Sequence, residues 1–201
     1  MSNLFESLIA RPLAEKMRPT RLELLVGQEH LLAPDAPLGR MLRERRASSM
    51  ILWGPPGSGK TTLAKIIAEY VNMNFVSLSA VFSGVSDLRR VFDKAIERKK
   101  IGEETLLFVD EIHRFNRAQQ DSFLPFVEDG TVVLVGATTE NPSFELNSAL
   151  LSRCKVFILE KIARAGLEHL VKRAEKLEGK ELPLKQAVSY THLRAHETTP
   201  H

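Results

Sequence analysis

The chain has 201 residues, of which 43% are hydrophobic and 26% are charged. This balance is ordinary for a soluble globular protein, and the length allows one domain with a sizeable core plus part of a second. The single cysteine, Cys154, excludes an intramolecular disulfide, and no apolar run is long enough to cross a membrane. Both features favour a cytosolic protein. The formal net charge of +3 permits contact with nucleic acid but does not indicate it.

Five short apolar runs alternate with helical patterns along the chain. Residues 1–36 contain several prolines and predict an arm with short helical pieces, followed by a basic helix at 38–46. The strands are expected at 50–53, 75–78, 105–109, 132–135 and 156–159. The later helices are expected at 61–71, 87–98, 119–127, 146–151 and 163–177, and Pro125 is expected to interrupt the third of them. Strands separated by helices predict an α/β fold with a parallel five-stranded sheet covered by helices on both faces.

The end of the chain stands apart from the rest. Residues 188–198 (VSYTHLRAHET) resemble the translation of a transposase sequencing adaptor, and half of the six histidines lie in 188–201. A natural polar tail is the alternative interpretation. We interpret 188–201 as a non-native tail, exclude it from functional argument, and expect the natural protein to continue beyond residue 187.

A glycine-rich loop follows the first predicted strand. Residues 54–61 (GPPGSGKT) satisfy the P-loop pattern in full, with an apolar strand before the loop and an amphipathic helix after it. Glycines let backbone N–H groups approach phosphate oxygens closely, and the helix N-terminus adds a positive dipole end. Lys60 can reach the terminal phosphates, and the Thr61 hydroxyl can ligate Mg²⁺. The predicted nucleotide-binding residues are Gly54, Pro55, Pro56, Gly57, Ser58, Gly59, Lys60, Thr61 and Thr62.

Two acidic residues, Asp110 and Glu111, follow the third predicted strand directly. A carboxylate at the tip of a buried strand beside a P-loop can hold Mg²⁺, which is the role we predict for Asp110. The next carboxylate can polarise an attacking water, so Glu111 is the predicted base. A kinase would need no such glutamate, so Glu111 favours hydrolysis of ATP over phosphoryl transfer to another substrate.

His113 and Cys154 are the remaining residues with reactive side chains near these motifs. His113 is either part of a relay that couples hydrolysis to DNA or an ordinary histidine at a helix start, and we favour the second interpretation. Cys154 is interpreted as a small buried residue. No histidine or cysteine has companions at zinc-ligand spacing, so no zinc site is predicted.

Two further polar residues are candidate catalytic residues because each lies close to one end of a predicted strand. Thr139 follows the fourth predicted strand and could orient the water beside the γ-phosphate; Thr138 is the neighbour with which it is most easily confused. A turn whose threonines cap the next helix is the alternative. Arg153 lies between a short helix and the fifth strand, where it could stabilise charge on a neighbouring subunit's ATP or simply be a surface arginine.

The ordered set of P-loop, acidic pair, threonine and Ser-Arg-Cys resembles the AAA+ superfamily of ATPases. Four longer strings are similar to the replication-associated recombination protein A family, whose eukaryotic relatives are the Werner-helicase-interacting proteins. They are 11–20 (RPLAEKMRPT), 26–32 (VGQEHLL), 110–116 (DEIHRFN) and 136–144 (GATTENPSF). The resemblance covers about residues 4–187 and implies an AAA+ core at 37–160 and the start of a helical lid at 161–187.

The resemblance also implies an activity and partners. Lys60 would bind phosphate, Thr61 and Asp110 would serve Mg²⁺, Glu111 would be the base, Thr139 a sensor, and Arg153 would act in trans. Val26, Gly27 and Gln28 would touch adenine, largely through backbone. The family implies a DNA-dependent ATPase of the bacterial cytosol and nucleoid. It acts at stalled forks, DNA ends and single-stranded gaps, with single-stranded-DNA-binding protein and as a homotetramer.

Alternatives remain open at this point. A clamp-loader subunit or a Holliday-junction branch-migration motor would share the core motifs, although the Glu-Asn-Pro-Ser-Phe string argues against both. A nucleotide-gated binding module with poor turnover is a different class, and the sequence ends before a second sensor arginine or an assembly domain. Tetramer formation is therefore doubtful for this chain. Arg40, Arg43, Arg45 and Arg46 form one basic cluster, and residues 89–100 carry another; either is a candidate DNA contact or a solvated helix face.

Overall fold

The structure is a computed structural model that describes residues 17–19 and 21–179. Residues Pro19–Ile162 form one compact unit, and helix α10 (Arg164–Glu178) belongs to a second. The tail at 188–201 and most of the resembling string at 11–20 lie outside the described residues, as does the rest of the predicted lid beyond α10. The segment 21–36 of the predicted arm lies in the same compact unit as the sheet.

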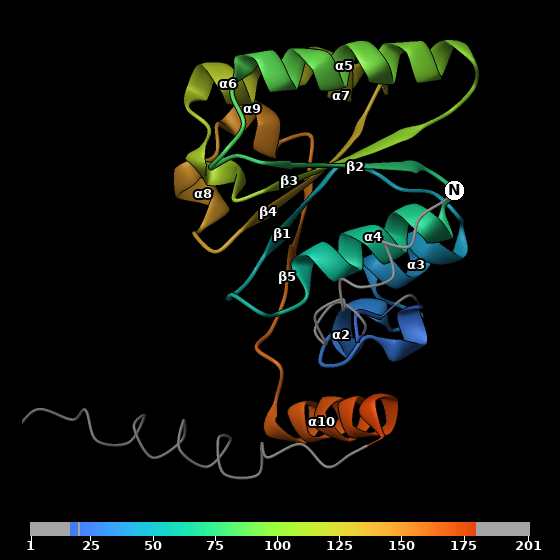
Figure 1. Cartoon of the computed structure of the whole chain (residues 1–201). Coiled ribbons are helices and arrows are strands. Elements are labelled where there is room, and N and C mark those ends of the chain that lie inside the picture. Colours follow the sequence, from blue (N-terminus) through green and yellow to red (C-terminus); the bar gives the residue numbers. More distant parts are fainter. Residues whose placement is uncertain (1–16, 20, 180–201) are drawn as a thin grey trace, which may run out of the picture. The chain divides into compact units, whose positions relative to one another are not determined.

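A parallel sheet of five strands forms the centre of the first unit (Figure 1). The strands lie in the order β2-β3-β4-β1-β5, and each paired neighbour is parallel. The predicted fold is therefore confirmed. Because the strands are parallel, all their carboxyl ends meet at one edge of the sheet and all their amino ends at the other. The strands are β1 (Met50–Trp53), β2 (Asn74–Ser79), β3 (Thr105–Asp110), β4 (Val133–Thr138) and β5 (Lys155–Ile158).

Helices cover both faces of this sheet (Figure 1). One face carries the short 3₁₀ turn η1 (Leu22–Leu24) and helices α2 (Glu29–Leu32), α3 (Pro37–Arg43) and α4 (Lys60–Tyr70). The other face carries the longest helix, α5 (Val85–Lys100), with short elements around it. These are η2 (Ile112–Arg114), α6 (Arg117–Asp121), α7 (Leu124–Glu128), α8 (Pro142–Glu145) and α9 (Ser148–Leu151).

Two hydrophobic cores result, one on each face, and alternate residues of the central strands supply them. In β3, Leu106 and Phe108 enter the core under α4, whereas Leu107 and Val109 enter the core under α5. All four side chains are at most 1% exposed. Successive side chains of a strand point to opposite faces, so a strand covered on both sides must be apolar throughout. Strand β3 is accordingly apolar from Leu106 to Val109, between Thr105 at its start and Asp110 at its end.

The helix predicted at 119–127 with an interruption at Pro125 forms as two helices, and the break lies before the proline rather than at it. Helix α6 ends at Asp121 and α7 begins at Leu124, with Pro125 in the first turn of α7. Proline has no N–H to donate and is tolerated in a first turn, where that donor would have no intrahelical acceptor. The proline therefore marks the beginning of a second helix.

Strand β4 extends three residues beyond its predicted end at Val135, through a glycine. A side chain at Gly136 would place its Cβ 2.8 Å from Ile51 Cδ1 and 2.9 Å from Ile112 Cδ1. The glycine is therefore a point of close packing inside the strand, although glycine weakens an isolated strand. The extension brings Thr138 to the last position of β4.

Helix α8 is absent from the prediction, and the helix predicted at 146–151 is shorter than expected. Each of the two short helices has an asparagine cap: Asn141 accepts from Ser143 N, and Asn147 accepts from Leu150 N. Leu146 between them is extended. Two separate asparagine caps therefore start two helices in this stretch.

Candidate functional site

The loop between β1 and α4 has a conformation that only its glycines permit. Gly57 and Gly59 have φ angles of +75° and +94°, in the left-handed region that other residues avoid. A Cβ at Gly54 would lie 2.4 Å from the backbone oxygen of Leu159, so the loop passes directly against the end of β5. A Cβ at Gly57 would have no atom within 4 Å, so the loop faces open space at its tip.

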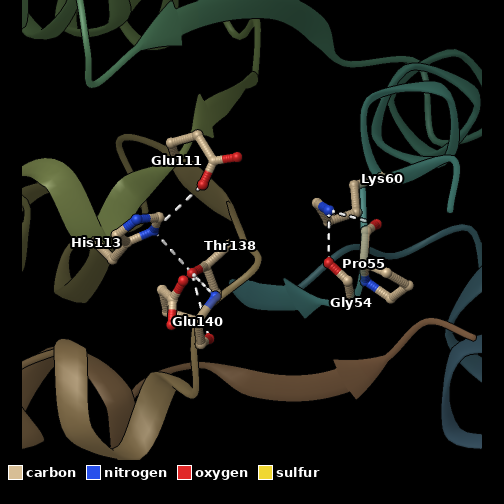
Figure 2. Close-up of polar contacts among 7 residues, drawn as sticks. All are labelled: Gly54, Pro55, Lys60, Glu111, His113, Thr138 and Glu140. Carbon is tan, nitrogen blue, oxygen red and sulfur yellow. Dashed lines mark hydrogen bonds and ion pairs between the residues drawn. The ribbon is translucent and has the colours of Figure 1, made fainter. Parts of the chain in front are cut away.

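The side chain of Lys60 is folded back onto this loop (Figure 2). Its ammonium group donates to the carbonyl oxygen of Gly54 at 2.7 Å and to that of Pro55 at 3.0 Å. Burial lowers the pKa of Lys60, and the nearby carboxylates of Glu111 and Asp110 oppose that shift. The charge is thus held by acceptors that phosphate oxygens could replace. Thr61 and Thr62 follow in the first turn of α4.

Ser58 supplies an unsatisfied polar atom at the same loop. Its hydroxyl oxygen is buried and has no hydrogen-bond partner within the described part of the chain. Leaving a buried hydroxyl without a partner costs on the order of 1–3 kcal/mol. A glycine loop in left-handed conformation, a buried cation and an orphaned hydroxyl together fit an anionic ligand such as a triphosphate.

Asp110 and Glu111 stand at the carboxyl end of β3, at the same edge of the sheet as the P-loop that follows β1 and with β4 between the two strands. Asp110 is the last strand residue, and Glu111 has φ +51°, a left-handed conformation that is strained for a residue with a side chain. This turn leads into η2, and both carboxylates act electrostatically on Lys60. The structure therefore brings together Lys60, Asp110 and Glu111, residues up to 51 positions apart.

His113 joins Glu111 to the end of β4 (Figure 2). Its Nδ1 atom lies 2.9 Å from the Thr138 hydroxyl and 3.3 Å from Glu111 Oε2. The Thr138 hydroxyl also accepts from the backbone N–H of Glu140 at 3.0 Å. The interpretation of His113 as an ordinary histidine at a helix start missed these contacts. The short spacing between Glu111 and His113 was the only sequence signal for them.

Thr138 and Thr139 occupy different environments. Thr138 is fully buried at the end of β4 and bonds to His113 and Glu140. Thr139 is the first residue beyond the strand and is half-buried. The sensor role of Thr139 stays a prediction, and Thr138 is the threonine that the structure connects to Glu111.

The segment predicted to touch adenine packs against the P-loop. Gln28 is fully buried, and its side-chain amide donates to the carbonyls of Ser58 and Glu160 and accepts from Glu160 N. That side chain is committed to the protein, so only the backbone near Val26 and Gly27 remains for a ligand. The N–H of Gly27 donates to Glu29, and this hydrogen bond lowers the pKa of the Glu29 carboxyl.

Arg153 lies away from the other candidate residues. It follows α9 and precedes β5, at the amino-end edge of the sheet, whereas the P-loop lies at the carboxyl-end edge. Its guanidinium forms an ion pair with Glu128 and donates to the carbonyl of Ala149 at 2.7 Å. The structure does not bring Arg153 together with Lys60, and action in trans stays a prediction.

Neither a metal cluster nor a membrane span is found in residues 17–19 and 21–179. No three histidine, cysteine or acidic side chains are grouped as metal ligands there. None of the helices in this range combines the length and apolar character that crossing a bilayer requires. Cys154 is half-buried, and burial raises the pKa of its thiol to about 12.

Comparison with known proteins gives consistent matches. The family model described as "ATPase family associated with various cellular activities (AAA)" matches residues 50–161. Replication-associated recombination protein A of Escherichia coli (strain K12) is 51% identical over 177 residues, which cover 87% of this chain and 40% of that protein. ATPase WRNIP1 of Dictyostelium discoideum is 55% identical over 162 residues, covering 81% of this chain and 18% of that protein.

A solved structure matches the same region. The Thermotoga maritima RuvB Holliday junction branch migration motor superposes with a TM-score of 0.66 at 33% identity. The match covers 81% of this chain and 55% of that one. The chain thus spans 40% or less of the two curated relatives described above and about half of the solved one.

Proposed function

The chain belongs to the AAA family of ATPases, and from that premise we propose that it binds ATP with Mg²⁺ and hydrolyses it to ADP and phosphate. The observation that carries the proposal is the convergence of Lys60, Asp110 and Glu111 beside an open glycine loop. A cation for phosphate, a carboxylate for a metal ion and a second carboxylate for water are the groups that this hydrolysis needs.

We assign the roles as follows. The backbone of residues 54–61 and the ammonium group of Lys60 bind the phosphates, after Lys60 exchanges its bonds to Gly54 and Pro55 for phosphate oxygens. Thr61 and Asp110 hold Mg²⁺, which when bound neutralises charge on the phosphate oxygens. Thr139 helps to orient the water.

Glu111 is the group that activates water in this proposal. Its carboxylate accepts a proton from the water as the water oxygen bonds to the γ-phosphorus. The bond from that phosphorus to the bridging oxygen breaks, and its electron pair leaves with ADP. Asp110 is still part of strand β3, whereas Glu111 has a left-handed backbone that departs from the strand. The two neighbouring carboxylates can therefore take different roles, and Glu111 suits the role of base.

We propose a cellular role from the relatives. Proteins named for replication-associated recombination are 51% to 56% identical to this chain over most of its length. We therefore propose DNA-dependent hydrolysis in the cytosol, near the nucleoid, during recombination and the response to stalled replication. Forks, ends and single-stranded gaps are the proposed DNA substrates. Single-stranded-DNA-binding protein and further copies of the chain, up to a tetramer in the full-length protein, are the proposed partners.

A basic hollow at the amino-end edge of the sheet is the proposed DNA contact. It has a volume of about 460 Å³ and lies between α3, the segment before β1 and the start of β5. Arg40, Arg46 and Lys155 line it against one acid, Glu44. The excess of cations suits phosphate oxygens of a nucleic acid backbone. Its place beyond the amino ends of β1 and β5 separates it from the nucleotide loop.

ATP turnover with and without forked DNA tests the proposal, with the Glu111→Gln variant as the matched control. DNA-stimulated turnover that is lost in the variant supports it. ATP binding without turnover in either form would support a nucleotide-gated binding module instead.

A branch-migration motor is the second candidate, since solved structures of RuvB are among those that match. Their identity of about 33% is well below the 51% shared with the recombination protein of Escherichia coli. Comparing stimulation by forked DNA with stimulation by a four-way junction separates the two candidates. Preference for the junction would favour the motor.

A further inference from the structure

We propose that His113 is a positioning residue for hydrolysis: its Nδ1–H group holds one carboxylate oxygen of Glu111 so that the other is free to meet water. The inference rests on the proposed function, because it requires Glu111 to be the base. It adds a residue that the P-loop and the acidic pair do not specify.

The first support is the place of the imidazole ring. The His113 side chain is 10% exposed, and that of Glu111 is 32% exposed. Figure 2 shows one Glu111 oxygen turned toward His113 and the other turned away from it, on the side of Lys60. The oxygen facing His113, Oε2, is buried and makes no full hydrogen bond within the described residues. A buried carboxylate oxygen needs a donor, and His113 Nδ1 lies 3.3 Å away.

The second support comes from assigning the protons. The Thr138 hydroxyl has one proton, and its contacts are Glu140 N at 3.0 Å, the Glu140 carbonyl at 3.3 Å and His113 Nδ1 at 2.9 Å. Glu140 N–H can only donate to the hydroxyl, and the Glu140 carbonyl can only accept its proton. These contacts accept a bare Nδ1 that takes the hydroxyl proton, and they equally accept an Nδ1–H that donates to the hydroxyl oxygen while the hydroxyl donates to the Glu140 carbonyl.

The contact with Glu111 distinguishes these two arrangements. A proton on Nδ1 faces Glu111 Oε2 as well as Thr138, whereas a bare Nδ1 would turn its lone pair toward a carboxylate. The opposite tautomer would therefore place repulsion at a contact of 3.3 Å. Glu111 therefore favours the Nδ1–H tautomer, which the Thr138 hydroxyl also accepts.

The third support is the backbone. Glu111 keeps a left-handed conformation at φ +51°, which persists only where surrounding contacts compensate for the strain. The contact with His113 acts on the Glu111 side chain, two residues along the same tight turn. It also links the base to Thr138, at the end of the strand from which Thr139 follows.

Turnover by position-113 variants tests the role. His113→Leu removes the donor and keeps an apolar filler, whereas His113→Asn keeps an amide N–H near the position of Nδ1. We expect His113→Leu to lower kcat about ten- to a hundredfold with KM and ATP affinity changed less than about twofold. His113→Asn should recover most of the lost kcat. Equal kcat losses in both variants, or a loss that lies in KM alone, would overturn the proposal.

A double-variant cycle separates positioning of the base from a general packing role. Once Glu111→Gln has removed the base, adding His113→Leu should lower kcat no further, because the two residues act as one unit. If the two losses multiply, His113 does not act through Glu111. Turnover unchanged by Glu111→Gln would contradict the proposed function itself. Loss in Glu111→Gln with normal turnover in His113→Leu would contradict this inference alone.

A measurement independent of turnover completes the test. Nitrogen-15 NMR of histidine-labelled protein reports which ring nitrogen carries the proton. The signals that disappear in His113→Asn assign the residue among the six histidines. We expect the Nδ1–H tautomer, the less common form in free histidine. An Nε2–H tautomer would overturn the inference even in a preparation that hydrolyses no ATP.

Discussion

The two edges of the central sheet hold two different kinds of site. The carboxyl-end edge gathers Lys60, Asp110 and Glu111 around a loop of the same chain, with Lys60 only 8% exposed. The amino-end edge presents Arg153, 38% exposed and paired with Glu128, and separately the hollow lined by Arg40, Arg46 and Lys155. The first is assembled within one chain, whereas the roles that we propose for the second require a partner.

The separation between the edges explains this division. Strands β1, β3 and β4 are four to six residues long, which spans about 13–20 Å at roughly 3.3 Å per residue. An arginine side chain cannot cross that distance, so Arg153 cannot serve the nucleotide of its own chain. Any catalytic role for it requires a second copy. Variants at the two edges should therefore affect different measurements.

The largest effect is expected for Lys60→Ala. Removing the ammonium group deletes the buried cation that faces phosphate, so ATP affinity should fall at least about a hundredfold, and turnover with it. Titration with a fluorescent ATP analogue measures the affinity. Lys94→Ala, on the exposed side of α5, is the matched control and should bind normally. Normal binding by Lys60→Ala would refute the phosphate site.

Glu111→Gln should separate binding from chemistry at the same edge. The amide cannot accept the proton of water, so kcat should fall about a hundred- to ten-thousandfold while ATP binds about as well as in the wild type. Single-turnover hydrolysis and analogue titration measure the two quantities. Wild-type turnover in this variant would assign the base to another group.

Arg153→Ala tests the opposite edge. In an assembly that hydrolyses ATP we expect a loss of at least about tenfold, with ATP affinity unchanged. Mixing this variant with Glu111→Gln should restore part of the activity, because one copy keeps the base and the other keeps the arginine. Failure to complement, with both variants assembled by size-exclusion chromatography, would show that Arg153 does not act in trans.

The basic hollow predicts a smaller effect on a different measurement. Arg46→Ala combined with Lys155→Ala should weaken binding to forked DNA about tenfold at low salt. The slope of log affinity against log salt concentration should fall by an amount that corresponds to about one to two phosphate contacts. Fluorescence anisotropy at several salt concentrations measures both. The pair Arg90→Ala and Lys94→Ala on α5 serves as control, and ATP affinity should stay constant in all variants. Equal losses in the two pairs would indicate only general charge attraction.

The smallest expected effect concerns Cys154, next to Arg153. Burial raises the pKa of its thiol to about 12, so almost no thiolate exists at about pH 8. Alkylation of the folded chain by iodoacetamide should therefore be much slower than alkylation in urea, as followed by mass spectrometry. Rapid labelling of the folded chain would show that the start of β5 opens.

Much of the nucleotide edge could be predicted from the sequence because its residues are close in the chain or end a recognisable strand. The residues from Gly54 to Thr61 are consecutive, so the motif in the sequence is the whole loop. Asp110 comes directly after a run of four apolar strand residues. The β4 extension was missed, and the interruption expected at Pro125 proved to be a break between two helices that falls before this proline. Gly136 and Pro125 usually interrupt such elements, and here packing at Gly136 and first-turn placement of Pro125 accommodate them.

The sequence by itself determined the parallel sheet, the P-loop and the acidic pair, because apolar periodicity and local motifs need only neighbouring residues. Tertiary structure alone decided that His113 contacts Thr138 and that Gln28 contacts Glu160. It also decided that Arg153 and Lys60 lie at opposite edges of the sheet. These contacts join residues 25 and 132 positions apart. Such contacts depend on which strands become neighbours and on the edge of the sheet that each residue reaches. Both are settled when the helices bury the two faces of the sheet at the same time.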